Sequence, residues 1–157
     1  MQTLYTIITG HLFLTLLLSI ALVMISCLFH YGIIHYMQVK FIEKFNLKHV
    51  SKFLSICFIL FFAHTVEIWF YAYIYLWLHG ADFGTLEGVY LTGGWDDYLY
   101  FSATSYTTLG VGDIFPTGAM RIIASIEAIN GLMLIAWSAT FLYFHMEKRW
   151  LIKHHED

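Results

Sequence analysis

Three apolar runs, each long enough to cross a lipid bilayer, constrain the fold of this chain more than any other feature of its sequence. They cover approximately residues 4–37, 53–78 and 119–144, and about 20 apolar residues suffice for a transmembrane helix. The 157-residue chain is 59% hydrophobic and only 12% charged, so little of it remains for a soluble domain. The sequence therefore predicts an all-α membrane protein, built as one integral domain around three transmembrane helices.

The same composition argues against several other classes of protein. The formal net charge is -3, and no basic cluster lies on a soluble region, so nucleic-acid binding is not expected. The first run exceeds thirty residues and lacks a positively charged start, which favours a retained helix over a signal peptide. Cys27 and Cys57 both lie inside apolar runs, so we expect buried thiols and neither a disulfide nor a metal-binding pair.

The connection between the second and third runs, residues 80–118, predicts a re-entrant loop. Its first part is rich in glycine, whereas residues 95–107 are aromatic and hydroxyl-rich, long enough for a short helix and too short to cross the membrane. Non-helical backbone at membrane depth is tolerated only where protein or a water-filled cavity surrounds it. A short pore helix that leads into extended backbone satisfies this condition.

Residues 107–113, which follow the expected pore helix, read Thr-Thr-Leu-Gly-Val-Gly-Asp. A dehydrated cation can be held by stacked backbone carbonyls when successive C=O groups point the same way. Left-handed backbone geometry makes this possible, and glycine reaches that geometry without a steric penalty. Gly110 and Gly112 therefore suit a cation filter, and the Thr108 hydroxyl adds an oxygen at its inner end.

This motif resembles the TVGYG filter of potassium channels, with Leu109 for the first valine and Val111 for the tyrosine. With Pro116 three residues after Asp113, and with a span on each side, residues 53–143 are similar to the pore module of the two-transmembrane potassium channel family, here with an additional N-terminal helix. The resemblance implies a passive potassium-selective channel and no enzyme activity. The implied ion-binding residues are Thr108, Leu109, Gly110, Val111 and Gly112, whose carbonyls would replace the hydration shell of K⁺.

The expected working unit is a homotetramer in a lipid bilayer, because the chain has one filter sequence and a ring of four loops surrounds the ion. The resemblance implies no cofactor and no metal other than the permeating K⁺ ions. None of the spans carries the repeated arginines of a voltage sensor. Only thirteen residues follow Phe144, too few for a soluble regulatory domain.

The sequence departs from the family around the filter. Val111 stands where family members usually have an aromatic ring, so its bracing is expected to come from apolar packing. This departure leaves two alternatives open, a weakly selective monovalent cation channel and a non-conducting accessory or sensory subunit. Thr104 replaces a glutamate that pairs with the filter aspartate in some members, and we expect Tyr100 to donate to Asp113 instead. The expected filter-supporting residues are Tyr100, Phe101, Thr104, Thr107 and Asp113.

Basic residues predict the orientation. Seven of the eight Lys and Arg residues lie in the first connection or after the third run, and the positive-inside rule makes that side cytoplasmic. We therefore expect a multi-pass protein of the cell membrane, such as a bacterial plasma membrane, with its N-terminus outside and its C-terminus in the cytoplasm. Acidic residues of the outer side would form either a cation-concentrating vestibule or an ordinary polar loop. They are Asp82, Glu87, Asp96, Asp97 and Asp113.

The first connection repeats a lysine every four residues, at Lys40, Lys44 and Lys48, with Phe41 and Phe45 on another face. This pattern predicts an amphipathic interfacial helix. The expected organisation is an additional N-terminal helix (1–37), the amphipathic linker (38–52), the pore module (53–145) and a short cytoplasmic tail (146–157).

Three ionisable residues inside the runs, His64, Glu67 and Glu127, are functional candidates because such groups are costly in a membrane. They predict either a hydrogen-bonded network behind the filter, with Glu127 bonded to the pore helix, or a proton-sensitive gate based on His64. The remaining histidines, including His30, are expected to be interfacial or tail residues, and their spacing predicts no bound metal.

Two residues of the third run are candidates for gating. Gly131 would act as a hinge of the inner helix or as a close-packing position. Phe144 falls at helical spacing with Met133, Ala136 and Thr140, so it would form a hydrophobic constriction or face lipid.

Overall fold

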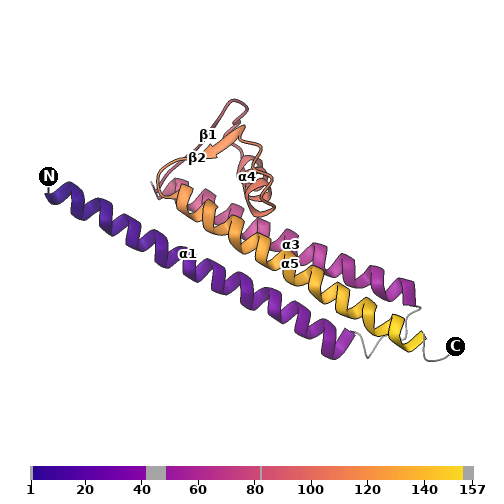
Figure 1. Ribbon diagram of the computed structural model, residues 1–157. Coiled ribbons are helices and arrows are strands. Elements are labelled where there is room, and N and C mark those ends of the chain that lie inside the picture. Colours follow the sequence, from indigo (N-terminus) through magenta and orange to yellow (C-terminus); the bar gives the residue numbers. More distant parts are fainter. Residues whose placement is uncertain (1, 42–48, 82, 154–157) are drawn as a thin grey trace.

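The computed structural model describes residues 2–41, 49–81 and 83–153, and it consists mainly of three long helices that lie side by side (Figure 1). They are α1 (Gln2–Tyr36), α3 (His49–Gly80) and α5 (Met120–Lys153). Three helical stretches are apolar and long enough to cross a membrane. They are Leu12–Val39, which runs from α1 into the turn that follows it, Val50–Gly80 in α3 and Met120–Glu147 in α5. The predicted three transmembrane helices are therefore confirmed.

A short helix, α4 (Trp95–Tyr106), lies off the long helices near one end of the bundle (Figure 1). With 12 residues it is about 18 Å long, too short to span, as the sequence predicted for the pore helix. Asp96 and Asp97 stand in its first turn, where carboxylates favour the positive end of the helix dipole. The helix ends at Tyr106, so its negative end lies directly before the predicted filter.

Residues 42–48 of the predicted amphipathic linker lie outside the described residues. Before the gap at 42–48, α1 continues into a π-helical turn, η1 (Met37–Phe41), and after the gap α3 begins at His49. The described parts of residues 38–52 therefore extend the two neighbouring helices.

Two clusters of buried side chains hold the helices together. The outer cluster joins the pore helix to the spans through residues such as Tyr71, Tyr75 and Phe101. The inner cluster contains Ile34 of α1, Met37 of η1, and Ile56 and Leu60 of α3, with α5 side chains packed beside them. The additional N-terminal helix thus packs against the pore region of its own chain.

The outward faces of the long helices carry large apolar side chains, among them Phe13, Phe58 and Ile129, each more than 60% exposed in the single chain. Soluble monomers rarely expose apolar surface on this scale. These faces suit lipid or neighbouring subunits, as expected for an integral membrane protein.

A small antiparallel ribbon connects the loop before α4 to the segment after the filter. It is formed by β1 (Leu86–Gly88) and β2 (Ile114–Pro116), with Leu86 opposite Pro116 and Gly88 opposite Ile114. Beside the ribbon, the Thr85 backbone N–H donates to the Thr117 hydroxyl at 3.0 Å. The sequence predicted only a loop here, because strands of three residues carry too little periodicity to be recognised.

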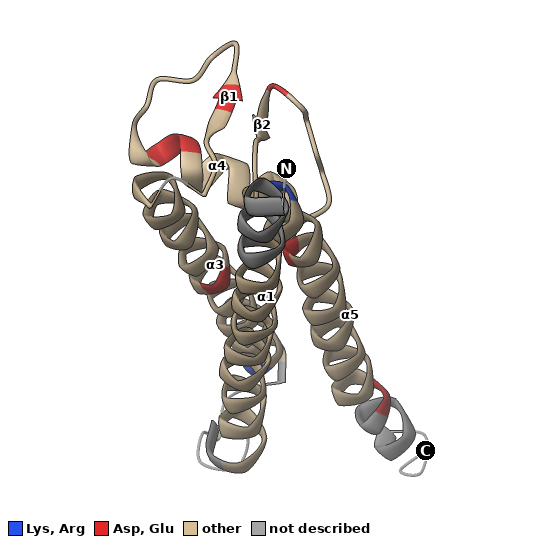
Figure 2. Cartoon of the chain, turned by 90° about the vertical axis from the view of Figure 1, so that its left-hand side faces the viewer, with Lys and Arg blue, Asp and Glu red and all other residues tan. Residues whose placement is uncertain are grey.

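Charged residues are few along the long helices, and several carboxylates gather around α4 and β1 (Figure 2). The first turn of α4 and strand β1 carry carboxylates at the end where α1 begins, whereas Lys52 lies near the opposite end. Arg121 stands in the first turn of α5, at the same end as these carboxylates, and Glu147 lies near the end of α5, at the opposite end.

Candidate functional site

The predicted filter alternates left-handed residues with residues of ordinary backbone geometry. Thr108, Gly110 and Gly112 have φ angles of 57°, 53° and 86°, whereas Leu109 and Val111 between them are not in that region. A cation filter needs successive carbonyl groups on the same side of the chain, and left-handed residues at alternate positions permit this arrangement. The left-handed φ angles that such a filter requires are therefore present in a single chain.

The left-handed Thr108 is unusual because a β-branched residue at positive φ is a true outlier. Such backbone costs roughly 1–3 kcal/mol and persists only where the surrounding structure holds it. Here the Thr108 N–H donates to the Ser105 carbonyl at 2.9 Å, and the Gly110 N–H donates to the Thr104 carbonyl at 3.1 Å. The end of the pore helix thus fixes the start of the filter segment.

The Asp113 end of the predicted filter is tied to α4 by a side chain. The Tyr100 hydroxyl lies 3.1 and 3.0 Å from the two carboxylate oxygens of Asp113 and donates to this group. This is the hydrogen bond that the sequence predicted. It raises the pKa of Tyr100 above its usual range, because the bond to Asp113 favours the protonated phenol. Asp113 also accepts from the Ile114 N–H at 3.0 Å.

Two other supporting residues point elsewhere. Phe101 is buried against Tyr75, with ring centroids 5.1 Å apart in an edge-on arrangement, whereas Val111 is 55% exposed. Thr104 donates back to the Phe101 carbonyl at 2.9 Å. Within one chain, the expected apolar bracing of Val111 by Phe101 is therefore not seen.

Asp97, one of the acidic residues of the candidate vestibule, has a structural role. It is 6% exposed and accepts hydrogen bonds from the Thr92 and Gly93 N–H groups at 2.9 and 2.8 Å. The polar-loop alternative therefore applies to this residue. Glu87, by contrast, is exposed on β1.

Glu127 anchors the inner helix to the pore helix, as predicted. It is fully buried and accepts hydrogen bonds from Ser102 of α4 at 2.6 Å and from Tyr75 of α3 at 2.5 Å. Because a buried carboxylate must be paired, these two hydroxyls fix the spacing of three helices behind the filter.

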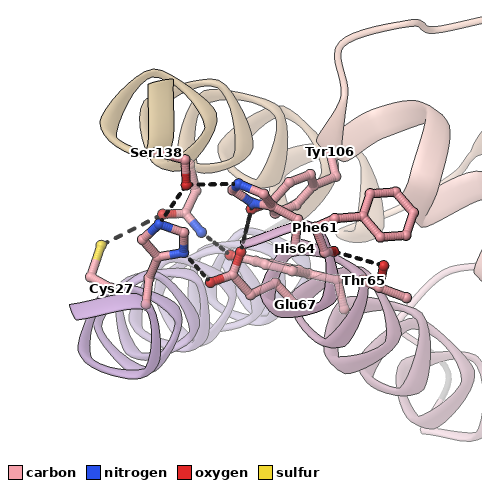
Figure 3. Close-up of polar contacts among 10 residues, drawn as sticks. Cys27, Phe61, His64, Thr65, Glu67, Tyr106 and Ser138 are labelled. Atoms are coloured by element: carbon pink, nitrogen blue, oxygen red, sulfur yellow. Dashed lines mark hydrogen bonds and ion pairs between the residues drawn. The ribbon is translucent and has the colours of Figure 1, made fainter. Parts of the chain in front are cut away.

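Glu67 of α3 is the centre of a second cluster of buried polar side chains (Figure 3). Its carboxylate meets His64 at 3.2 Å, as the sequence predicted, and also His30 of α1 at 3.0 Å. The Tyr106 hydroxyl, at the end of the pore helix, donates to the same carboxylate. Both imidazoles also lie 3.0 Å from the hydroxyl of Ser138 on α5.

His30 corrects the prediction that the remaining histidines are interfacial or tail residues. It is completely buried and belongs to the Glu67 cluster. Its position inside an apolar run was the available signal, since ionisable residues there are functional candidates by default. Ser138 carried no such signal. Among the described residues, His30, His64 and Glu67 are also the group whose donor atoms lie close enough to hold a metal ion.

Gly131 lies where α5 crosses the end of the pore helix. A Cβ atom at this position would lie only 2.1 Å from the Tyr106 carbonyl oxygen. The absence of a side chain therefore permits this close approach, which supports the packing role predicted for Gly131.

One side of the filter and the inner helix is uncovered in the single chain. A groove of about 810 Å³ runs beside the pore helix and the filter, lined by Thr108, Gly110 and Gly112 and by Arg121 of α5. Leu109 is 68% exposed. Further inward, Met133, Ala136, Thr140 and Phe144 all lie on an exposed face of α5, as their helical spacing predicted.

Comparisons with known proteins agree with this architecture. Residues 56–147, more than half of the chain, match the ion channel family. A membrane protein of Bacillus subtilis (strain 168), the uncharacterized YdjJ, is 41% identical over 49 residues, which cover 31% of this chain and 14% of that protein. No solved structure matches the chain. The chain therefore belongs to the ion channel family, to which the resemblance of its filter and flanking helices pointed.

Proposed function

We propose that this protein is a potassium-selective channel that conducts passively through a filter formed by four copies of the chain. The observation that carries the proposal is the alternation of left-handed residues at Thr108, Gly110 and Gly112. Carbonyl groups turned to one side replace the hydration shell of a K⁺ ion. Membership in an ion channel family favours transport over catalysis.

The fourfold assembly is supported by the exposure of the filter. A filter must surround the ion, but in the single chain Gly110 and Gly112 open onto a groove of about 810 Å³. Neighbouring copies would fill this groove and close the ring. The negative end of the pore helix α4, directly before Thr107, favours a cation in front of it.

We infer an orientation in which the filter opens to the outside of the cell. The basic residues of the first connection and the tail would then face the cytoplasm, and the start of α1 would face out. The exposed Glu87 and the carboxylate of Asp113 would lie at the outer mouth, where they attract cations.

Val111 determines how strictly potassium is selected. Its side chain has no hydrogen-bonding atom and is 55% exposed, so within the chain it does not hold the filter at a fixed width. This observation favours the second candidate function, a weakly selective monovalent cation channel. The two candidates differ in the ratio of potassium to sodium permeability.

Reversal potentials of the purified protein in planar bilayers, under potassium and sodium gradients, distinguish the candidates. A potassium-selective channel gives a reversal potential near that of potassium, and Val111→Tyr leaves it there or moves it closer. Val89→Tyr is the matched control, because Val89 is 85% exposed in the outer loop. Equal permeabilities would replace the potassium channel by the weakly selective one, and the absence of current and of liposome flux would favour a non-conducting accessory subunit.

A further inference from the structure

The Glu67 cluster comprises the side chains of His30, His64, Glu67, Tyr106 and Ser138, which converge from all three long helices and the pore helix (Figure 3). Nothing in the proposed conduction mechanism uses it. Both histidines have one ring nitrogen, Nδ1, beside the Glu67 carboxylate and the other, Nε2, beside the Ser138 hydroxyl. His30, Glu67 and Ser138 are each at least 95% buried.

The hydrogens of this cluster do not suffice for its contacts. With Glu67 ionised and both imidazoles neutral, each imidazole, Ser138 and Tyr106 supplies one hydrogen. If both Nδ1 atoms carry the hydrogens, both Nε2 lone pairs compete for the single Ser138 hydrogen. If an Nε2 atom carries one, the Nδ1 lone pair of that ring faces the Glu67 carboxylate. In this protonation state the cluster is one hydrogen short and carries the buried charge of Glu67, which a bound cation would offset.

We propose that His30, His64 and Glu67 form a binding site for a transition-metal ion such as Zn²⁺. Two imidazoles and one glutamate are a common zinc donor set, with metal bonds of about 2.0–2.2 Å. In a tetrahedral site such bonds separate neighbouring ligand atoms by about 3.3 Å. The His30 Nδ1 lies 3.0 Å from one Glu67 oxygen and the His64 Nδ1 lies 3.2 Å from the other. One ligand atom from each of the three residues lies within 4.8 Å of the other two, so the three ligands close around an ion by small side-chain movements.

The surrounding groups suit a bound ion. When both Nδ1 atoms bind the metal, both Nε2–H groups donate to the Ser138 oxygen, which has two lone pairs. The Tyr106 hydroxyl, which lies 2.9 Å from the His64 Nδ1, then donates to Glu67 alone. Outer partners of this kind orient metal-binding histidines. Tyr106 donates to the carboxylate in the same way.

His30, His64 and Glu67 supply three ligands, so the fourth ligand would be water. Zinc with three protein ligands commonly keeps such a water, which readily becomes hydroxide. A bound hydroxide together with Glu67 would balance the charge of a divalent ion.

The site would join the additional helix to the pore. Helix α1 provides His30 as a ligand, and α3 provides His64 and Glu67. Tyr106, which donates to Glu67, immediately precedes the filter. A metal ion here would fasten α1 beside the pore helix and hold the inner end of the filter through Tyr106.

Binding of Co²⁺ to the purified full chain in detergent tests the proposal, because tetrahedral Co²⁺ has intense visible absorption and Zn²⁺ displaces it. His154 and His155 are changed to Ala in every sample, since adjacent histidines bind Co²⁺ by themselves. We expect one ion per chain, loss of this binding in His64→Asn and Glu67→Gln, and an affinity lowered roughly 10–100-fold in Ser138→Ala. His35→Asn, five residues from His30 on the same helix, is the matched control and should bind as before.

A further variant distinguishes the loss of a metal ligand from the loss of the fold. His64→Cys keeps a ligand and should add a thiolate-to-Co²⁺ charge-transfer band, whereas binding elsewhere would not move the spectrum. The proposal is overturned if Co²⁺ and Zn²⁺ do not bind, or if the ligand variants bind like the control. It is also overturned if the ¹⁵N resonances of the imidazoles show that a proton is bound in place of a metal ion. None of these readouts depends on ion conduction, so this test and the channel test fail separately.

Discussion

Gly131→Ala tests how closely the inner helix approaches the pore helix. In the structure the added Cβ would lie 2.1 Å from the Tyr106 carbonyl oxygen and 2.9 Å from its carbonyl carbon. Real Cβ atoms essentially never come closer than 3.0 Å to another heavy atom. The obstacle is backbone at the end of a hydrogen-bonded helix, so it cannot turn away as a flexible side chain would, and α5 must move.

The expected change in the free energy of unfolding of Gly131→Ala follows from two opposing effects. Forcing an extra methyl group into a packed site costs about 1–3 kcal/mol, and the severe overlap with backbone places Gly131→Ala at the upper end of that range. Alanine favours the helix by about 1 kcal/mol over glycine. The net loss of about 2 kcal/mol corresponds to a melting temperature about 4–8 °C lower for a chain of this size.

The assay is thermal unfolding of the purified protein in detergent, with potassium flux measured in liposomes in parallel. Gly32→Ala is the matched control, because a Cβ at Gly32 of α1 meets no atom within 4 Å, and its melting temperature should stay constant or rise. We expect Gly131→Ala to lower both stability and flux, since Tyr106 directly precedes the filter. A Gly131→Ala protein as stable as the wild type, but with altered flux, would refute the close-packing argument and favour a hinge at this position.

Three further outcomes are expected. Tyr100→Phe should speed the loss of conduction during sustained activity, measured as current decay in planar bilayers, because Asp113 loses its hydroxyl donor; unchanged decay would discard this support. The bond to Asp113 raises the pKa of Tyr100, so the bond should be fully formed below about pH 10, the ordinary tyrosine pKa. It should be lost as the pH rises through the raised pKa. Current decay in the wild type should therefore become faster across this pH range, whereas current decay in Tyr100→Phe should not change. Glu127→Ala should cost roughly 1–3 kcal/mol, because the buried Tyr75 hydroxyl loses its acceptor, whereas Ser102 keeps the Ile68 carbonyl at 2.8 Å. Glu127→Gln keeps both contacts and should lower the melting temperature much less; equal losses would show that the bonds to Glu127 do not carry the effect.

Much of the site was predictable because its signals are local in the sequence. The glycines at 110 and 112 indicated a left-handed backbone, and the structure has this geometry. The bond between Tyr100 and Asp113 followed from the missing glutamate at position 104, since a helix places Tyr100 one turn before that position and on the same face. The contact between Glu127 and Ser102 followed from the need of a buried carboxylate for a partner.

The features that the sequence did not predict depend on packing between distant segments. His30 stands more than thirty residues from His64, so spacing could not show that the two rings lie 5.0 Å apart between ring centroids. The ribbon of β1 and β2 joins segments on either side of the pore helix, and strands of three residues have no periodicity to detect.

By itself, the sequence determined that this chain lies in a membrane with three long helices. It also determined that a short helix and a glycine-containing filter segment lie between the second and the third long helix. Length and hydropathy decide these properties, because a lipid bilayer accepts only segments that satisfy their own backbone hydrogen bonds. Only the tertiary structure decided which buried groups meet. The partners of Glu67 and the close approach of Gly131 to Tyr106 depend on the relative rotation and depth of the helices, and side-chain packing between helices sets both.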